Sequence, residues 1–182
     1  GIRVLGAPLG SPEFCRRFGE RQVAKAVPLA EAIAKLPPQQ HAWLLLYLCL
    51  TPKANHLLRQ VPPSLAGAAA DAQDALTGDG LRRLLGEASG DLPEKVLRQA
   101  RRPQRLGGLG LRDSHRLSPA AFWASWADAL PVLCERFRWF REGFAERLLA
   151  DTGDGSEVRG VACLEELQRV RRSLAEEAVI PT

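Results

Sequence analysis

The sequence lacks methionine altogether and has no long apolar run. Its longest apolar run, Ala42 to Leu50, is far shorter than the ~20 residues that a membrane-spanning helix needs, so we expect no membrane contact. Because the chain opens on Gly1 and holds no methionine, we expect it to be a piece of a longer polypeptide. No signal or transit peptide can be recognised at such a start.

Cysteine is scarce, and its four copies lie far apart, at Cys15, Cys49, Cys134 and Cys163. No two of them have the spacing of about two to four residues that zinc sites use. Each lies in an apolar helical pattern, where a thiol behaves as a small hydrophobic group. We therefore expect reduced core cysteines without disulfides or a metal site, in an intracellular protein of the nucleus or cytoplasm.

Motifs for catalysis are also missing. Asp151-Thr152-Gly153 matches the tripeptide of aspartic proteases, but no strand pattern surrounds it, so an interhelical loop is the better interpretation. Asp71 and Asp74 share a helix face without the further oxygen ligands that a divalent cation needs. The glycines from Gly107 to Gly110 fit neither a dinucleotide fingerprint nor a P-loop. We expect no enzyme activity and no cofactor in this chain alone.

Globular composition is present, with 46% hydrophobic and 25% charged residues in 182. That length suits one domain, or a domain with an extension. Helical periodicity interrupted by proline and glycine predicts an all-α fold, an irregular multi-helix bundle. A short strand and turn at Gly1–Gly10 is the exception to this pattern.

Caps and apolar spacing predict where the helices lie. Ser11-Pro12 opens a first helix that Pro28 breaks, and Gln39–Leu50 is apolar on nearly all sides and therefore expected in the core. Ser64 is expected to cap an Ala-rich helix that Gly78 and Gly80 interrupt. The other expected helices are Thr51–Arg59, Pro93–Arg102, one that begins at Ser118-Pro119, and Glu157–Ala178 with Val161, Leu164, Leu167, Val170 and Leu174 on its inner face.

The helix after Ser118 carries an aromatic stripe whose members are three or four residues apart. This spacing places them on one helical face, with a kink expected at Pro131, and core packing is the expected role. The stripe consists of Trp123, Trp126, Leu130, Leu133, Phe137, Phe140, Phe144 and Leu148.

Positive charge is concentrated in one segment. The whole chain has 25 Lys and Arg against 21 Asp and Glu, whereas Asp113 is the one acid between Lys95 and Arg116. Such a segment either contacts a polyanion such as nucleic acid or forms an ordinary solvated helix face. Its arginines are Arg98, Arg101, Arg102, Arg105, Arg112 and Arg116.

Three segments, in this order, resemble the region downstream of the palm in reverse transcriptases of non-LTR retrotransposons. The stretch from Val4 to Ser11 (VLGAPLGS) resembles the primer grip, with Leu5, Gly6, Pro8 and Gly10 at the motif positions. Thr51–Arg59 (TPKANHLLR) is similar to the helix that follows it in the family. Arg105–Asp113 (RLGGLGLRD), with the Ala- and Trp-rich residues 120–126, is similar to a third conserved turn and helix.

The resemblance implies a thumb-like, non-catalytic fragment of an RNA-directed DNA polymerase. The family's palm aspartates bind two divalent ions, but Tyr47 is followed here by Leu48-Cys49-Leu50, so that chemistry would lie outside this chain, with the palm and fingers. The implied partner is the backbone of an RNA–DNA or DNA duplex, held without sequence readout by the arginines.

This interpretation divides the chain into a primer-grip-like strand and turn (residues 1–10), a thumb-like helical domain (11–130) and a C-terminal helical extension (131–182). Two alternatives to this interpretation stay open. One is a helical protein-interaction module, with the aromatic stripe as its docking groove. The other is a decayed retroelement relic that binds no nucleic acid.

Overall fold

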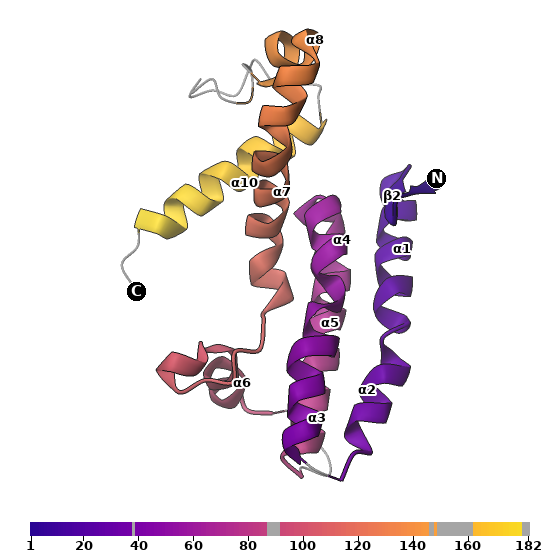
Figure 1. The fold of residues 1–182 in the computed structure, drawn as a ribbon, viewed down its shortest axis with the longest axis vertical. Coiled ribbons are helices and arrows are strands. Elements are labelled where there is room, and N and C mark those ends of the chain that lie inside the picture. The colour runs from indigo at the N-terminus through magenta and orange to yellow at the C-terminus, as the bar shows by residue number, and fades with distance from the viewer. Residues whose placement is uncertain (38, 87–91, 146–147, 149–161, 180–182) are drawn as a thin grey trace.

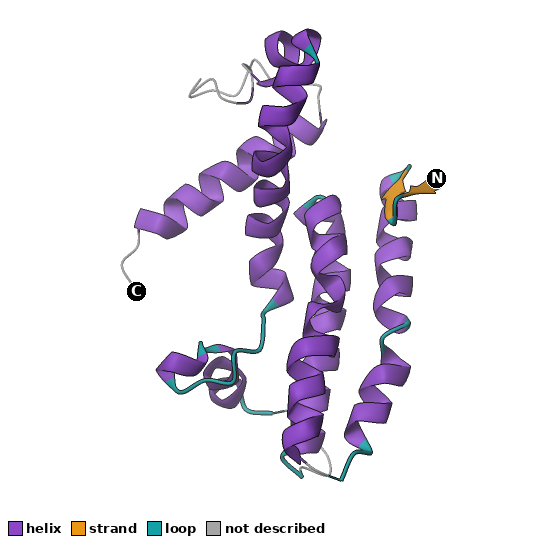
Figure 2. Ribbon diagram, viewed as in Figure 1, coloured by secondary structure: helices purple, strands orange, loops and turns teal. Residues whose placement is uncertain are grey.

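The chain folds into helices with one small hairpin at the N-terminus, which confirms the predicted all-α class (Figure 1). The computed structural model describes residues 1–37, 39–86, 92–145, 148 and 162–179. Within these residues, strands occur only in the hairpin, as Figure 2 shows.

The hairpin pairs β1 (Ile2–Val4) with β2 (Ala7–Leu9) in antiparallel register, with Val4 opposite Ala7. Leu5 and Gly6 form the turn between them, at φ values of +49° and +87°. Two positive φ values in a two-residue loop are those of a type I′ turn, whose twist matches that of the paired strands. The predicted strand and turn are confirmed, and β2 is an addition to the prediction.

Two long rods follow the hairpin (Figure 1). In the first, the Ser11 hydroxyl accepts the Phe14 N–H and caps α1, as predicted, and the chain breaks before Pro28 enters the first turn of α2. The second rod passes from α-helix through a π-helical and a 3₁₀ turn back to α-helix. The elements are α1 (Pro12–Ala24) and α2 (Val27–Ala34), then α3 (Gln39–Leu45), η1 (Leu46–Leu50), η2 (Thr51–Ala54) and α4 (Asn55–Gln60).

The helix α5 (Pro63–Leu84) is central, because it contacts α1, α2, α3, α4 and α7. The prediction that Gly78 and Gly80 interrupt it is wrong, since α5 continues through both. A Cβ on Gly80 would lie 2.8 Å from Leu46 Cδ1, so this glycine allows two helices to approach closely. The packing of the two helices outweighs the low helix propensity of glycine.

The remaining elements leave this centre in two directions. The short α6 and η3 project to one side, while α7 rises beyond the end of α4 and α10 crosses it (Figure 1). Their bounds are α6 (Glu94–Arg101), η3 (Gln104–Leu106), α7 (Ser114–Arg136), α8 (Arg138–Phe140), η4 (Arg141–Ala145) and α10 (Ala162–Val179). The predicted boundary between the thumb-like domain and the C-terminal extension, after residue 130, lies inside the helix α7.

Buried side chains form three clusters. One joins α1, α4 and α5, a second joins α2, η1, α5 and α6, and a third joins α7 to α10. Within the third, Leu164, Leu167 and Val170 are buried as predicted, whereas Val161 lies outside the described residues. Core packing is confirmed for part of the aromatic stripe: Phe140 and Leu148 are buried, and four members are partly buried against the third cluster, namely Trp123, Trp126, Leu130 and Phe144. Phe137 is exposed, because α7 ends at Arg136.

The segment Gln39–Leu50 is less buried than its composition predicts. Ala42, Leu46 and Leu50 are fully buried, but the outer face carries exposed apolar side chains. They are Leu44, Leu45 and Leu48, beside the exposed Cys49. The expectation that all four cysteines are core residues is therefore wrong for Cys49, because only one face of this rod meets its neighbours. All four are free thiols.

Candidate nucleic-acid interface

The six predicted arginines lie on consecutive elements from α6 to the first turn of α7. Arg98 and Arg101 belong to α6, Arg102 follows its last residue, and Arg105 lies in η3. Arg112 precedes α7, and Arg116 is in its first turn. Arg101 is half-buried and the other five are exposed.

The glycine-rich turn after η3 folds back onto the end of α6. The N–H groups of Leu109 and Leu111 donate to the carbonyl of Ala100, at 3.1 and 3.2 Å. The Gly110 N–H donates to the Arg102 carbonyl at 2.9 Å. These bonds hold residues 100–102 beside residues 109–111, so arginines that are ten positions apart in the sequence belong to one compact unit.

Glycine is required in this turn for two reasons. Gly107 and Gly110 have φ values of +74° and +69°, a region that side chains with a Cβ disfavour. A Cβ on Gly108 would lie 1.9 Å from the Arg102 carbonyl oxygen, which no side chain could tolerate. The predicted turn is confirmed.

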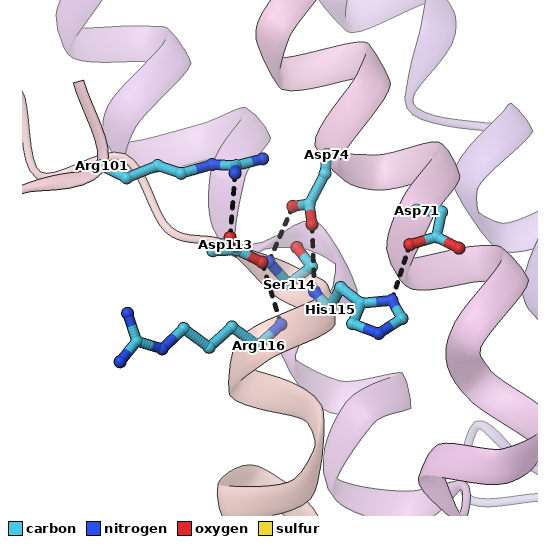
Figure 3. Close-up of polar contacts among 7 residues, drawn as sticks. All are labelled: Asp71, Asp74, Arg101, Asp113, Ser114, His115 and Arg116. Atoms are coloured by element: carbon cyan, nitrogen blue, oxygen red, sulfur yellow. Dashed lines mark hydrogen bonds and ion pairs between the residues drawn. The ribbon is translucent and has the colours of Figure 1, made fainter. Parts of the chain in front are cut away.

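The acidic side chains next to this unit are occupied by internal contacts (Figure 3). Asp113 pairs with Arg101 at 3.0 Å and accepts the Arg116 N–H at 2.9 Å, which caps α7. Asp74, on α5, accepts the N–H groups of Ser114 and His115 at 2.7 and 3.0 Å. Each of these carboxylates satisfies backbone N–H groups of the first turn of α7, which have no partner within the helix.

This anchoring corrects the predicted start of α7. The helix begins at Ser114, four residues before the expected cap at Ser118. Ser118 is instead a buried residue inside the helix, and its hydroxyl has no hydrogen-bond partner among the described residues. The carboxylates of Asp113 and Asp74 outweigh the local Ser-Pro signal.

The surroundings of Asp74 also change the pKa of its carboxyl. Burial raises the pKa of the Asp74 carboxyl above its ordinary value of 3.8, and the negative charge of Asp113 adds to the rise. The hydrogen bonds from His115 and Ser114 lower the pKa and offset part of this effect.

The surface charge of the unit is therefore positive. Only Arg101 among the six arginines has an ion-pair partner within the described part of the chain. Figure 3 shows the Arg116 guanidinium extending away from the carboxylates. Five cationic side chains stay free to contact an anionic partner.

The primer-grip-like residues lie at the other side of the molecule (Figure 1). Leu5 and Gly6 form the hairpin turn, Pro8 is buried in β2 and Gly10 follows that strand. A Cβ on Gly6 would lie 2.9 Å from His56 Nε2 on α4. Two of the three motif segments thus touch, whereas the arginine segment lies apart from them.

A cavity of about 230 Å³ opens where these two segments meet. Polar side chains from three elements line it, namely Gln22, Lys25, Lys53 and His56. The sequence interpretation missed this cluster. Lys53 and His56 belong to the Thr51–Arg59 motif, so this motif could have indicated two members of the cluster. Nothing in the sequence around Lys25 indicates that it joins them.

The described residues contain no group of three or more His, Cys, Asp or Glu side chains placed to hold a metal ion. No helix among them combines the length and the apolar character needed to cross a membrane. The Asp151-Thr152-Gly153 tripeptide lies outside the described residues.

No family model, curated protein or solved structure matches the chain.

Proposed function

We propose that the chain is a non-catalytic, thumb-like helical module that holds the phosphate backbone of a nucleic-acid duplex. The observation that carries this proposal is the set of exposed arginines without ion pairs on α6, the glycine turn and the start of α7. Arginine suits the task, because its planar guanidinium donates two parallel hydrogen bonds to phosphate oxygens.

The internal use of the neighbouring carboxylates supports the same proposal. Asp74 and Asp113 are directed toward backbone N–H groups and Arg101, so they do not neutralise the outward-facing arginines. An ordinary solvated helix face typically intersperses both signs of charge. The unbalanced charge of this face favours a polyanion instead.

The reverse-transcriptase resemblance supplies the parent activity in this proposal. The catalytic aspartates, their divalent ions, the palm and the fingers would belong to other parts of the parent protein. The contribution of this chain is contact with phosphates, which positions a duplex without reading its bases.

Replacing three of the exposed arginines tests the assignment. We expect the variant Arg102→Ala/Arg105→Ala/Arg112→Ala to bind an RNA–DNA duplex at least about tenfold more weakly than the unchanged chain at low salt. Fluorescence anisotropy measures the two affinities. The matched control is Arg136→Ala/Arg141→Ala/Arg172→Ala, three exposed arginines away from α6. Equal loss in the two variants would contradict a defined interface.

A protein-interaction module is the second candidate. The exposed apolar face of Leu44, Leu45 and Leu48 favours it, because contiguous apolar surface is typical of docking sites. The aromatic stripe favours it less, since α10 packs against Trp123, Trp126 and Leu130. Concentration-dependent light scattering that Leu48→Ser abolishes, without duplex binding, would favour this candidate.

A further inference from the structure

The cavity between the hairpin turn and α4 carries a second, separate set of basic side chains. Lys25 follows the last residue of α1, Lys53 lies in η2 and His56 lies in α4. Gln22 adds a side-chain amide, and the backbone of Gly6 closes one side. The cluster therefore draws on elements that are neighbours only in the folded chain.

No negative charge balances this cluster. The lining contains no acidic side chain, and its apolar part consists of Phe18, Ala26 and Leu57. The side chains of Lys25, Lys53 and His56 have no hydrogen-bond or ion-pair partner among the described residues. Two ammonium groups around one concave surface repel each other, and an anion held between them would relieve that repulsion.

The position of Gly6 makes the cavity possible. Its φ of +87° turns the hairpin toward α4, and its missing side chain leaves the space beside His56 Nε2 open. Any Cβ there would lie 2.9 Å from that nitrogen and would obstruct the imidazole face of the cavity. A residue with a side chain at position 6 would therefore compete with a ligand.

We propose that this cavity binds a phosphate group. Ammonium groups bind phosphate as point charges, and the amide and imidazole add hydrogen-bond donors from other directions. With about 230 Å³, the cavity is smaller than the pockets of about 300–1,000 Å³ that enclose drug-sized ligands. A phosphate group, free or at the end of a nucleic-acid strand, matches the charge and fits within this volume.

This site is independent of the arginine segment. The hairpin and α6 lie at opposite corners of the molecule in Figure 1. Loss of duplex binding in the arginine variant would leave the phosphate site intact, and loss of the phosphate site would leave the arginines unchanged. The two proposals can therefore fail separately.

Titration of the full chain with inorganic phosphate, followed by NMR of the histidine rings, tests the site. The chain has three histidines, so His41 and His115 serve as internal controls. We expect saturable shifts of the His56 signals at constant ionic strength and pH. Chloride at the same ionic strength should not produce them.

Two exposed lysines supply the variants, and both can be replaced without disturbing the core. Lys25→Ala and Lys53→Ala should each raise the dissociation constant for phosphate about three- to tenfold. The exposed Lys35, outside the cavity, supplies the control Lys35→Ala, which should not change it. Equal shifts of all three histidines, or no effect of either lysine variant, would overturn the proposal.

A short DNA strand with and without a terminal phosphate distinguishes the two sources of the ligand. A His56 shift that the phosphorylated strand produces and the unphosphorylated strand does not would identify a strand end as the source. A His56 shift with inorganic phosphate and with neither strand would identify free phosphate. If neither the phosphorylated strand nor inorganic phosphate shifts His56, the proposal is wrong.

Discussion

At the scale of single residues, Asp74 connects the centre of the bundle to the arginine segment. Its carboxylate accepts two N–H groups from a helix that begins 40 residues later in the sequence. The spacing of Asp71 and Asp74 predicts that they share a helix face. The one function this suggests is a metal site, which the sequence analysis rejects because further oxygen ligands are missing. Asp71 instead contacts the imidazole of His115 at 2.6 Å, and the partners of Asp74 are backbone groups, which leave no signal in a sequence.

The raised pKa of Asp74 gives a prediction with a defined sign. A carboxyl whose pKa is higher in the folded state than in the unfolded state contributes stability that decreases as pH rises through the folded pKa. We therefore expect the free energy of unfolding, relative to that of Asp74→Asn, to decrease between about pH 3.5 and pH 7. Urea denaturation of both proteins at the two pH values measures the difference.

The exposed Asp128→Asn variant is the matched control, since Asp128 lies outside this network and pairs with Arg59. If the free energy of unfolding of the unchanged chain, relative to that of Asp74→Asn, increased with pH, the account of Asp74 burial would be contradicted. Such an increase would mean that the two backbone hydrogen bonds dominate over desolvation in setting the pKa.

At the scale of elements, carboxylates supply the partners for helix starts that the local sequence assigns to serines, and two of them, Asp74 and Glu166, are distant in the sequence. Asp74 and Asp113 hold the first turn of α7 in place of Ser118. In α5 the helix starts at Pro63, so Ser64 is not its cap, and the Ser64 N–H donates to Glu166 of α10 at 3.0 Å. Local cap rules cannot find an acceptor 102 residues away.

Glu166 is buried, with 4% of its surface exposed, and it also pairs with Arg169. Glu166→Ala should lower the free energy of unfolding by about 1–2 kcal/mol, because the Ser64 N–H loses its acceptor. It should also speed amide exchange in α10, which this contact joins to α5.

Chemical denaturation and hydrogen exchange measure both effects. Glu176→Ala, at an exposed position on the same helix, is the control and should change little. Equal effects of the two variants would show that the bond to Ser64 does not hold α10 in place.

At the scale of the whole molecule, the sequence predicted the class of fold and many element boundaries, because those depend on local patterns. Ser11, Pro28 and the glycines at 107 and 110 act where the sequence places them. What depends on tertiary contacts was missed: the continuity of α5 at Gly80, the exposed face of Leu44 to Cys49, and the cavity beside Gly6.

The candidate interface could likewise be predicted only in part from the sequence. Arginine enrichment was visible in the sequence, but whether those arginines are free depends on the partners of Asp74 and Asp113, which belong to the folded molecule. The reverse-transcriptase relationship stays a prediction based on motif order.

The salt dependence of duplex binding tests the central claim most directly. Each phosphate contact contributes about 0.9 to the slope of log affinity against log salt concentration, so up to five free arginines predict a slope between about −2 and −5. Anisotropy titrations of an RNA–DNA duplex across a salt series give this slope. Binding that does not change with salt, or no binding at low salt, would contradict a backbone clamp.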